Sequence, residues 1–184
     1  FQLAGLSPPE LPAGVGQHVA LNGNLAVTGS ALNLSDASVT VDGNSVLVSA
    51  DATLVGRPVL SARIDAGALD LSRFIGDEDE EESEESGSGW SKETIDVSAL
   101  QKLDADILIS AASVDLGLVQ IAPFVTRTRL DEGRAVTELR KLGAYGGNIG
   151  GSFVINSRGG LSVRANLVGQ GIAVQSVLSQ FVDF

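Results

Sequence analysis

Apolar and polar residues alternate with a period of two along most of this chain. Val19, Leu21, Leu25 and Val27 alternate with small or polar residues, and Gly23 interrupts the run. A period of two is typical of a strand with one apolar face and one wetter face. The same pattern returns in 39–54, 60–64, 103–110, 125–139, 149–155 and 161–167. These runs predict about eight strands, mostly in sequential antiparallel order.

Short turn signals separate the alternating runs. Asp42-Gly43-Asn44 and Asp131-Glu132-Gly133 each stand between two such runs, as expected for tight hairpins. Gly56-Arg57-Pro58 and the stretch 157–160 (Ser-Arg-Gly-Gly) have the composition of further turns. The chain therefore reads as consecutive strands joined by short connections.

Three segments depart from the period of two. In 69–75, 116–124 and 172–181 the apolar residues recur at spacings of three and four. This spacing predicts three short helices, each directly after a strand.

One module occurs twice in the sequence. Both 43–64 and 147–165 open with Gly-Asn and continue through an alternating run and an Arg-bearing turn to Leu-Ser-x-Arg. Repeats of this kind usually extend one sheet. We therefore expect a single β-rich domain over 1–184, built from two related halves at 17–75 and 90–184.

The acidity of the chain is local. The formal net charge is −11, and eight of the 23 acidic residues lie between Asp77 and Glu85. Repulsion among these carboxylates, next to a Gly/Ser stretch, predicts a disordered acidic insertion over 76–89. The rest of the chain is close to neutral and lacks the clustered Lys and Arg of a nucleic-acid groove, so no nucleic-acid partner is expected.

No constellation of catalytic residues is present. The chain has no cysteine and one histidine, His18, which falls in the polar phase of a strand. The glycines of 146–151 are followed by strand residues rather than by Lys-Ser or Lys-Thr, which favours a strand over a phosphate loop. We expect no enzyme, no cofactor and no metal site.

The length of the apolar stretches and the first residue of the chain both concern how the protein could attach to a membrane. The longest strongly apolar uncharged stretch, 116–126, is too short to span a bilayer. The chain opens at Phe1 and contains no methionine. We therefore expect a fragment of a longer protein, with any membrane anchor outside it.

The apolar phase of so many strands has to be covered, because apolar surface left in water costs about 25 cal/mol per Å². One possibility is a closed sandwich or helix-covered core. The other is a curved sheet whose apolar face is filled by acyl chains.

The C-terminal half resembles the AsmA family. The resemblance rests on the stretch 89–106, in which Trp90 is followed by Asp96, Leu100 and a strand opening with Leu-Asp-Ala-Asp. It continues through Leu139, Tyr145-Gly146-Gly147, Gly150-Gly151 and the closing Gly-Ile-Ala-Val-Gln-Ser-Val-Leu. It covers Trp90 to Phe181 well and Val39 to Phe74 more loosely.

The resemblance implies a periplasmic protein of the bacterial envelope, held in the inner membrane by an anchor and associated with outer-membrane biogenesis. The wider AsmA-like group is similar to bridge-type lipid transfer proteins, which have a long β-groove with an apolar interior. This implies a phospholipid or another acyl lipid as the partner.

We therefore predict a mainly β fold: a strongly twisted antiparallel sheet forming an open groove or half-barrel, with a few short helices. The expected function is non-enzymatic binding or conduction of acyl chains along the groove. The alternative is a structural or adhesin-like surface domain with a closed core and no lipid, and a hydrolase is a third hypothesis that lacks a base. The residues expected to bind lipid are Val19, Leu21, Leu25, Val46, Val48, Ile107, Ile109, Phe153, Ile155, Leu161 and Val163.

Overall fold

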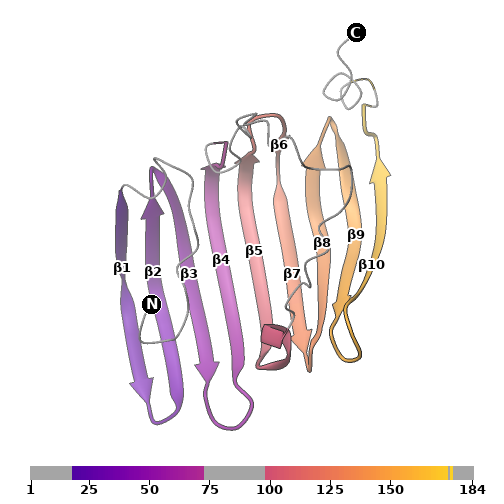
Figure 1. Ribbon diagram of the computed structural model, residues 1–184. Coiled ribbons are helices and arrows are strands. Elements are labelled where there is room, and N and C mark those ends of the chain that lie inside the picture. Colours follow the sequence, from indigo (N-terminus) through magenta and orange to yellow (C-terminus); the bar gives the residue numbers. More distant parts are fainter. Residues whose placement is uncertain (1–17, 73–97, 174, 176–184) are drawn as a thin grey trace, which may run out of the picture.

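The computed structural model describes residues 18–72, 98–173 and 175, and these form one ten-stranded sheet (Figure 1). This confirms the predicted mainly β architecture. The strands of the first half are β1 (Val19–Thr28), β2 (Ala31–Val41), β3 (Asn44–Thr53) and β4 (Val59–Asp70). A 3-10 helix, η2 (Ser98–Gln101), precedes β5 (Asp104–Asp115), β6 (Gln120–Ile121), β7 (Phe124–Asp131), β8 (Arg134–Ala144), β9 (Gly147–Asn156) and β10 (Ser162–Gln170).

The strand order is almost the chain order. Neighbours run β1-β2-β3-β4-β5-β7-β8-β9-β10, and the short β6 pairs with the end of β5. Every pair is antiparallel except β4 and β5, which are parallel, so the sheet is mostly antiparallel, as the sequence predicts. The described strands do not close into a barrel, because β1 and β10 are the two ends of the order.

The tight turns lie where the sequence predicts them. Asp42 and Gly43 join β2 to β3 with φ values of 49° and 88°, and Glu132 and Gly133 join β7 to β8 with 43° and 82°. Positive φ at both central residues is the geometry that matches the twist of paired strands, and Asp-Gly and similar pairs favour it. These residues set where each hairpin reverses.

Two of the predicted helices are wrong where the structure describes them. Leu69 and Asp70 continue β4, because they pair with the last residues of β5. Between 116 and 124 the chain forms a loop and β6 instead. Gly117 has a φ of 82° and Pro123 follows closely, and neither suits a helix interior. The predicted helix at 172–181 and the acidic insertion at 76–89 lie mostly or wholly outside the described residues.

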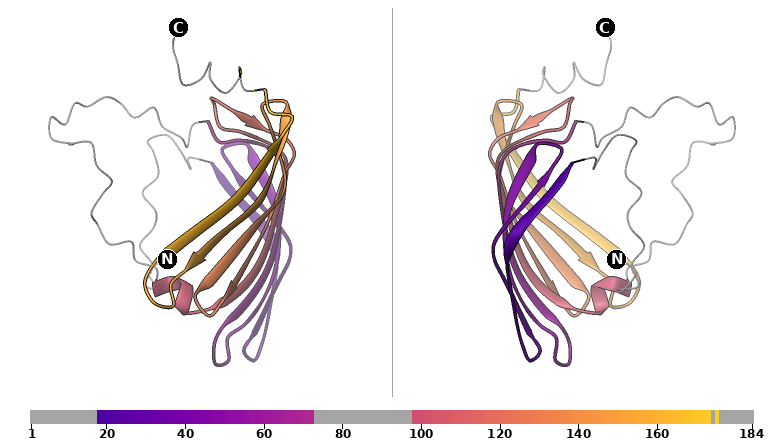
Figure 2. Two further views of the ribbon diagram at one scale, coloured as in Figure 1. Left: turned by 90° about the vertical axis from the view of Figure 1, so that its right-hand side faces the viewer. Right: turned by 90° about the vertical axis from the view of Figure 1, so that its left-hand side faces the viewer.

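The described strands make a single layer (Figure 2). Among the described residues, the hydrophobic side chains buried below a tenth exposure are five alanines and Val114. No large side chain of this part of the chain is fully buried. Side chains are therefore covered mainly by their lateral neighbours in the sheet.

Candidate functional site

The register of the first five strands brings their apolar phases onto one face. Leu21 lies opposite Val39, which lies opposite Val46. Val48 lies opposite Ile64, which lies opposite Ile109 of the parallel neighbour β5. Paired residues share a side of the sheet, and alternate residues of each strand follow them.

The same face continues across the second half of the sheet. Ile107 lies opposite Thr128, and Thr128 lies opposite Thr137. Phe153 then lies opposite Thr137, and Ile155 lies opposite Val163. Ten of the eleven residues predicted to bind lipid therefore share one face, and Leu161 immediately precedes β10 in the same phase.

We call this side of the sheet, with the large apolar residues on it, the apolar face. Several of them were not in the predicted set, although the same period of two could have found them once the register was known. The apolar face consists of Val19, Leu21, Leu25, Val27, Leu32, Leu34, Val39, Val41, Val46, Val48, Leu60, Ile64, Ile107, Ile109, Phe124, Leu130, Leu139, Leu142, Phe153, Ile155, Val163 and Leu167.

Exposure on the apolar face rises from the centre to the edges. Ile107, Ile109 and Phe153 are half-buried between neighbouring strands. Leu21 of β1 is 74% exposed and Val163 of β10 is 64% exposed. No described element lies over this face as a second packed layer, since the contacts between described strands follow the strand order of the sheet, apart from those of β6.

Three threonines interrupt the apolar face near its centre. Thr126 and Thr128 of β7 and Thr137 of β8 stand between the isoleucines of β5 and Phe153. The Oγ1 atoms of Thr128 and Thr137 are 2.9 Å apart and share a hydrogen bond. This bond partly offsets the cost of placing hydroxyl groups among apolar side chains.

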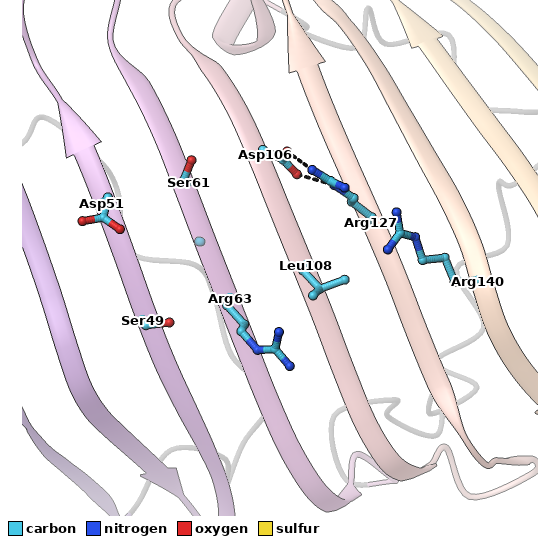
Figure 3. A pocket seen from close by; sticks show the side chains of 9 residues that line it. Ser49, Asp51, Ser61, Arg63, Asp106, Leu108, Arg127 and Arg140 are labelled. Carbon is cyan, nitrogen blue, oxygen red and sulfur yellow. Dashed lines mark hydrogen bonds and ion pairs between the residues drawn. The ribbon is translucent and has the colours of Figure 1, made fainter.

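The opposite face carries the charges of the central strands (Figure 3) and is called the polar face from here on. It also holds some exposed apolar side chains, such as Leu47, Val59 and Val168. A shallow hollow on this face is lined by serines and by charged side chains from β3, β4, β5, β7 and β8. The guanidinium of Arg127 binds both carboxylate oxygens of Asp106, with Nε 2.7 Å from Oδ1. Arg63 likewise binds Asp65, two residues further along β4.

These ion pairs shift the pKa of two carboxyl groups. The hydrogen bonds from Arg127 hold the pKa of Asp106 below its usual range. Those from Arg63, and then from the Ser110 hydroxyl, do the same for Asp65. Both carboxylates stay ionised at neutral pH and so have no proton to give as a general acid there, and the lowered pKa makes each a weak proton acceptor.

The remaining candidate groups are scattered. His18 immediately precedes β1, with its Nδ1 atom 4.0 Å from the Oδ1 atom of Asp42. The glycine-rich stretch forms the β8–β9 turn at Gly146 and then continues as β9 from Gly147. Among the described residues no group of three His, Cys, Asp or Glu side chains is placed to hold a metal ion. The described helical residues include no segment of the length and apolarity that a bilayer span requires.

Comparison with known protein families, with curated proteins and with solved structures finds no match to this chain.

Proposed function

We propose that this chain is a non-enzymatic segment of a lipid-binding protein of the bacterial envelope. The apolar face holds the acyl chains of a phospholipid or another lipid, and the sheet curves around them as an open groove. The opposite, polar face stays in water.

The observation that carries the proposal is the alignment of the apolar phases. Nine strands along the main path of the sheet each contribute apolar side chains to the same face. A slip of one residue in any pairing would send one strand's apolar set to the polar face. The opposite face has fewer large apolar side chains, among them Leu47, Val59 and Val168. An aligned apolar set of this kind is expected where a continuous apolar surface is required.

The exposure of these apolar residues supports a bound lipid rather than a closed protein core. An uncovered apolar patch larger than a few hundred Å² is unusual on a soluble protein and marks a binding surface. Leu25, with 66% of its surface exposed, and Val27, with 63%, stand among other apolar side chains of the same face. Acyl chains match such a surface because they need no hydrogen-bonding partner.

The resemblance of 90–181 to the AsmA family supports the location and the lipid class. On this resemblance we propose a periplasmic location at the inner membrane and a part in outer-membrane biogenesis. The role of the apolar face in binding lipid is supported without this resemblance, by the strand register and by the exposure of its side chains.

The test is solvent extraction of gently purified protein followed by lipid mass spectrometry. We expect acyl lipid to co-purify with the unaltered chain. The informative variant is Ile109→Asp, which places a charge at the centre of the apolar face. A carboxylate among acyl chains is costly to desolvate, so lipid loading should fall severalfold while the strand content stays unchanged.

The matched control is Leu108→Asp. Leu108 is the preceding residue of β5 and lines the polar hollow on the other face (Figure 3). This variant should keep its lipid. Lipid-free protein from every preparation would contradict the proposal. Unfolding caused by Ile109→Asp alone would instead indicate the alternative, a closed core without lipid.

A further inference from the structure

Strand β1 is an edge of the sheet that the described residues form. It pairs with β2 on one side, and no described strand pairs with its other side (Figure 2). All its residues are exposed, and its sequence, Val-Ala-Leu-Asn-Gly-Asn-Leu-Ala-Val-Thr, contains no charge and no proline. Natural edge strands are usually blunted by charged residues, proline or short length. A ten-residue edge without these devices is suited to pair with another strand.

The backbone groups of β1 that do not face β2 can be assigned. The Asp42 amide donates to the His18 carbonyl at 2.9 Å, so the backbone of His18 faces β2. Hydrogen-bonding direction alternates along an antiparallel strand. The N–H and C=O groups of Val19, Leu21, Gly23, Leu25 and Val27 therefore point away from β2, toward the open side.

The sequence of this edge is the same in both directions. From Val19 to Val27 it reads Val-Ala-Leu-Asn-Gly-Asn-Leu-Ala-Val, a palindrome centred on Gly23. Two antiparallel strands run in opposite directions, so a two-fold axis midway between the two Gly23 residues would pair each residue with its own chemical type. Leu21 would face Leu25 of the other copy, and Asn22 would face its Asn24.

We propose that β1 is a self-pairing edge, and that a second copy of this chain adds its own β1 antiparallel about a two-fold axis that passes midway between Gly23 of one copy and Gly23 of the other. The outward N–H and C=O groups of the two strands satisfy one another. Because the axis is perpendicular to the sheet, the apolar faces of both copies lie on the same side. The result is a closed, isologous dimer with one continuous apolar face.

The other edge does not support the same pairing. Strand β10 is equally exposed, but its sequence, Ser-Val-Arg-Ala-Asn-Leu-Val-Gly-Gln, has no such symmetry and includes Arg164. Joining β10 of one copy to β1 of the next would also be antiparallel. That joint is heterologous and would continue into an open-ended chain of copies, which the mass of the assembly distinguishes from a dimer.

The first experiment measures mass by sedimentation and light scattering over a range of concentrations. We expect a monomer–dimer equilibrium with no larger species. The Asn22→Lys/Asn24→Lys double variant places like charges opposite one another across the axis and should be monomeric. Mixing it with an Asn22→Glu/Asn24→Glu variant should restore a mixed dimer. The side chains of Asn22 and Asn24 are exposed on the polar face, so both double variants should keep the fold.

The control puts the same charges on the other edge, as Ser162→Lys/Asn166→Lys on β10, and should remain dimeric. A folded chain that is monomeric throughout, growth beyond the dimer, or loss of the dimer in the β10 variant but not in the β1 variant would each overturn the proposal.

Cysteine cross-linking tests the register, since the chain has no cysteine of its own. Asn22 and Asn24 of the partner would form a non-hydrogen-bonded pair with Cα atoms about 4.5 Å apart, within disulfide range. A mixture of Asn22→Cys and Asn24→Cys chains should therefore cross-link on oxidation, whereas either variant alone should not. Cross-linking of single variants as efficient as that of the mixture would contradict the register. This readout does not depend on lipid, so it can fail while the proposed function holds.

Discussion

Arg57 and Asp104 join the turn after β3 to the first residue of β5, with the Arg57 Nε atom 2.7 Å from Asp104 Oδ1. The same guanidinium donates to the carbonyl oxygens of Gln101, at 2.6 Å, and Leu103, at 3.0 Å. The Asp104 amide in turn donates to the Pro58 carbonyl at 2.8 Å. These contacts fasten η2 and the start of β5 to the β3–β4 hairpin, which is where the parallel pairing of β4 with β5 begins.

Replacing Arg57 with Ala should destabilise the fold more than most surface substitutions. The carbonyl groups of Gln101 and Leu103 lose their side-chain donor, and this should lower the free energy of unfolding by about 1–2 kcal/mol. Arg57→Lys should recover only part of this, because an ammonium cannot reproduce the planar fork of donors. Urea unfolding measures the change. The control is Arg63→Ala, because the side-chain partner of Arg63 lies on its own strand. If both variants lose the same stability, Arg57 does not fasten β5 to the β3–β4 hairpin.

The stability of the fold should fall in acid, and Asp104 should account for part of the fall. The Glu132 amide, at 2.8 Å from Oδ1, and then Arg57 hold the pKa of Asp104 below its usual range. A carboxyl group whose pKa is lower in the folded state stabilises folding above its unfolded pKa, about 3.9, and loses that contribution as the pH falls through the folded value.

Thermal unfolding across the acidic range checks this prediction. Asp65 and Asp106 act in the same direction, so the unaltered chain should lose stability progressively below about pH 4. Asp104→Asn should be less stable at neutral pH and show a shallower decline. A decline as steep as that of the unaltered chain would show that Asp104 does not contribute.

Gly23 has no room for a side chain. A Cβ atom at this position would lie 2.8 Å from the Ala37 Cα atom and 2.9 Å from its Cβ atom. The β1–β2 register shifts here, and Asp36 takes a φ of 51°, so the bulged strand brings Ala37 over the glycine. Gly23→Ala should therefore cost about 1–3 kcal/mol.

The matched control is Gly67→Ala in β4. Apart from Gly67 and its two chain neighbours, no described residue has a heavy atom within 4 Å of the added Cβ, and the φ of Gly67 lies outside the left-handed region. This substitution should be neutral or slightly stabilising, because alanine restricts the unfolded chain. Chemical denaturation of both variants gives the comparison, and equal effects would mean that the contact with Ala37 is relieved at little cost.

The strands and their turns could be predicted because both signals are local. The period of two is visible within each strand, and Asp42-Gly43 marks its turn without reference to the rest of the chain. The shared face could not be predicted, because it depends on which residue of the next strand lies opposite. The parallel pairing of Ile64 with Ile109 in particular joins strands far apart in sequence.

The false helices have an equally local cause. A spacing of three and four in 116–124 resembles one turn of an amphipathic helix, but Leu118 is exposed and Gly117 has a positive φ. Short apolar segments are ambiguous between helix and strand for this reason. In β7 the sequence does not show which side chains face the apolar side, because Thr126 and Thr128 alternate with arginines. Only their pairing with Ile109 and Ile107 assigns the two threonines to the apolar face.

The hydroxyl groups of Thr128 and Thr137 should be energetically coupled. Each is the other's hydrogen-bond partner at 2.9 Å, in a half-buried position among apolar side chains. Changing one of them to Val leaves the other hydroxyl without this partner, whereas changing both removes the polar pair altogether. A double-mutant cycle should give a coupling of about 0.5–1 kcal/mol, with the double variant more stable than the sum of the singles indicates.

Thr40 and Ser45 provide the control for this cycle. Their hydroxyl oxygens are 2.8 Å apart across β2 and β3, but they lie on the polar face, where water can replace either partner. Their coupling should be close to zero. The same Thr128→Val/Thr137→Val chain should also bind at least as much lipid as the unaltered one, because it makes the apolar face continuous between Ile107 and Phe153. Equal coupling in the two cycles would mean that water reaches the centre of the apolar face as readily as the polar face. That result would count against acyl chains lying there.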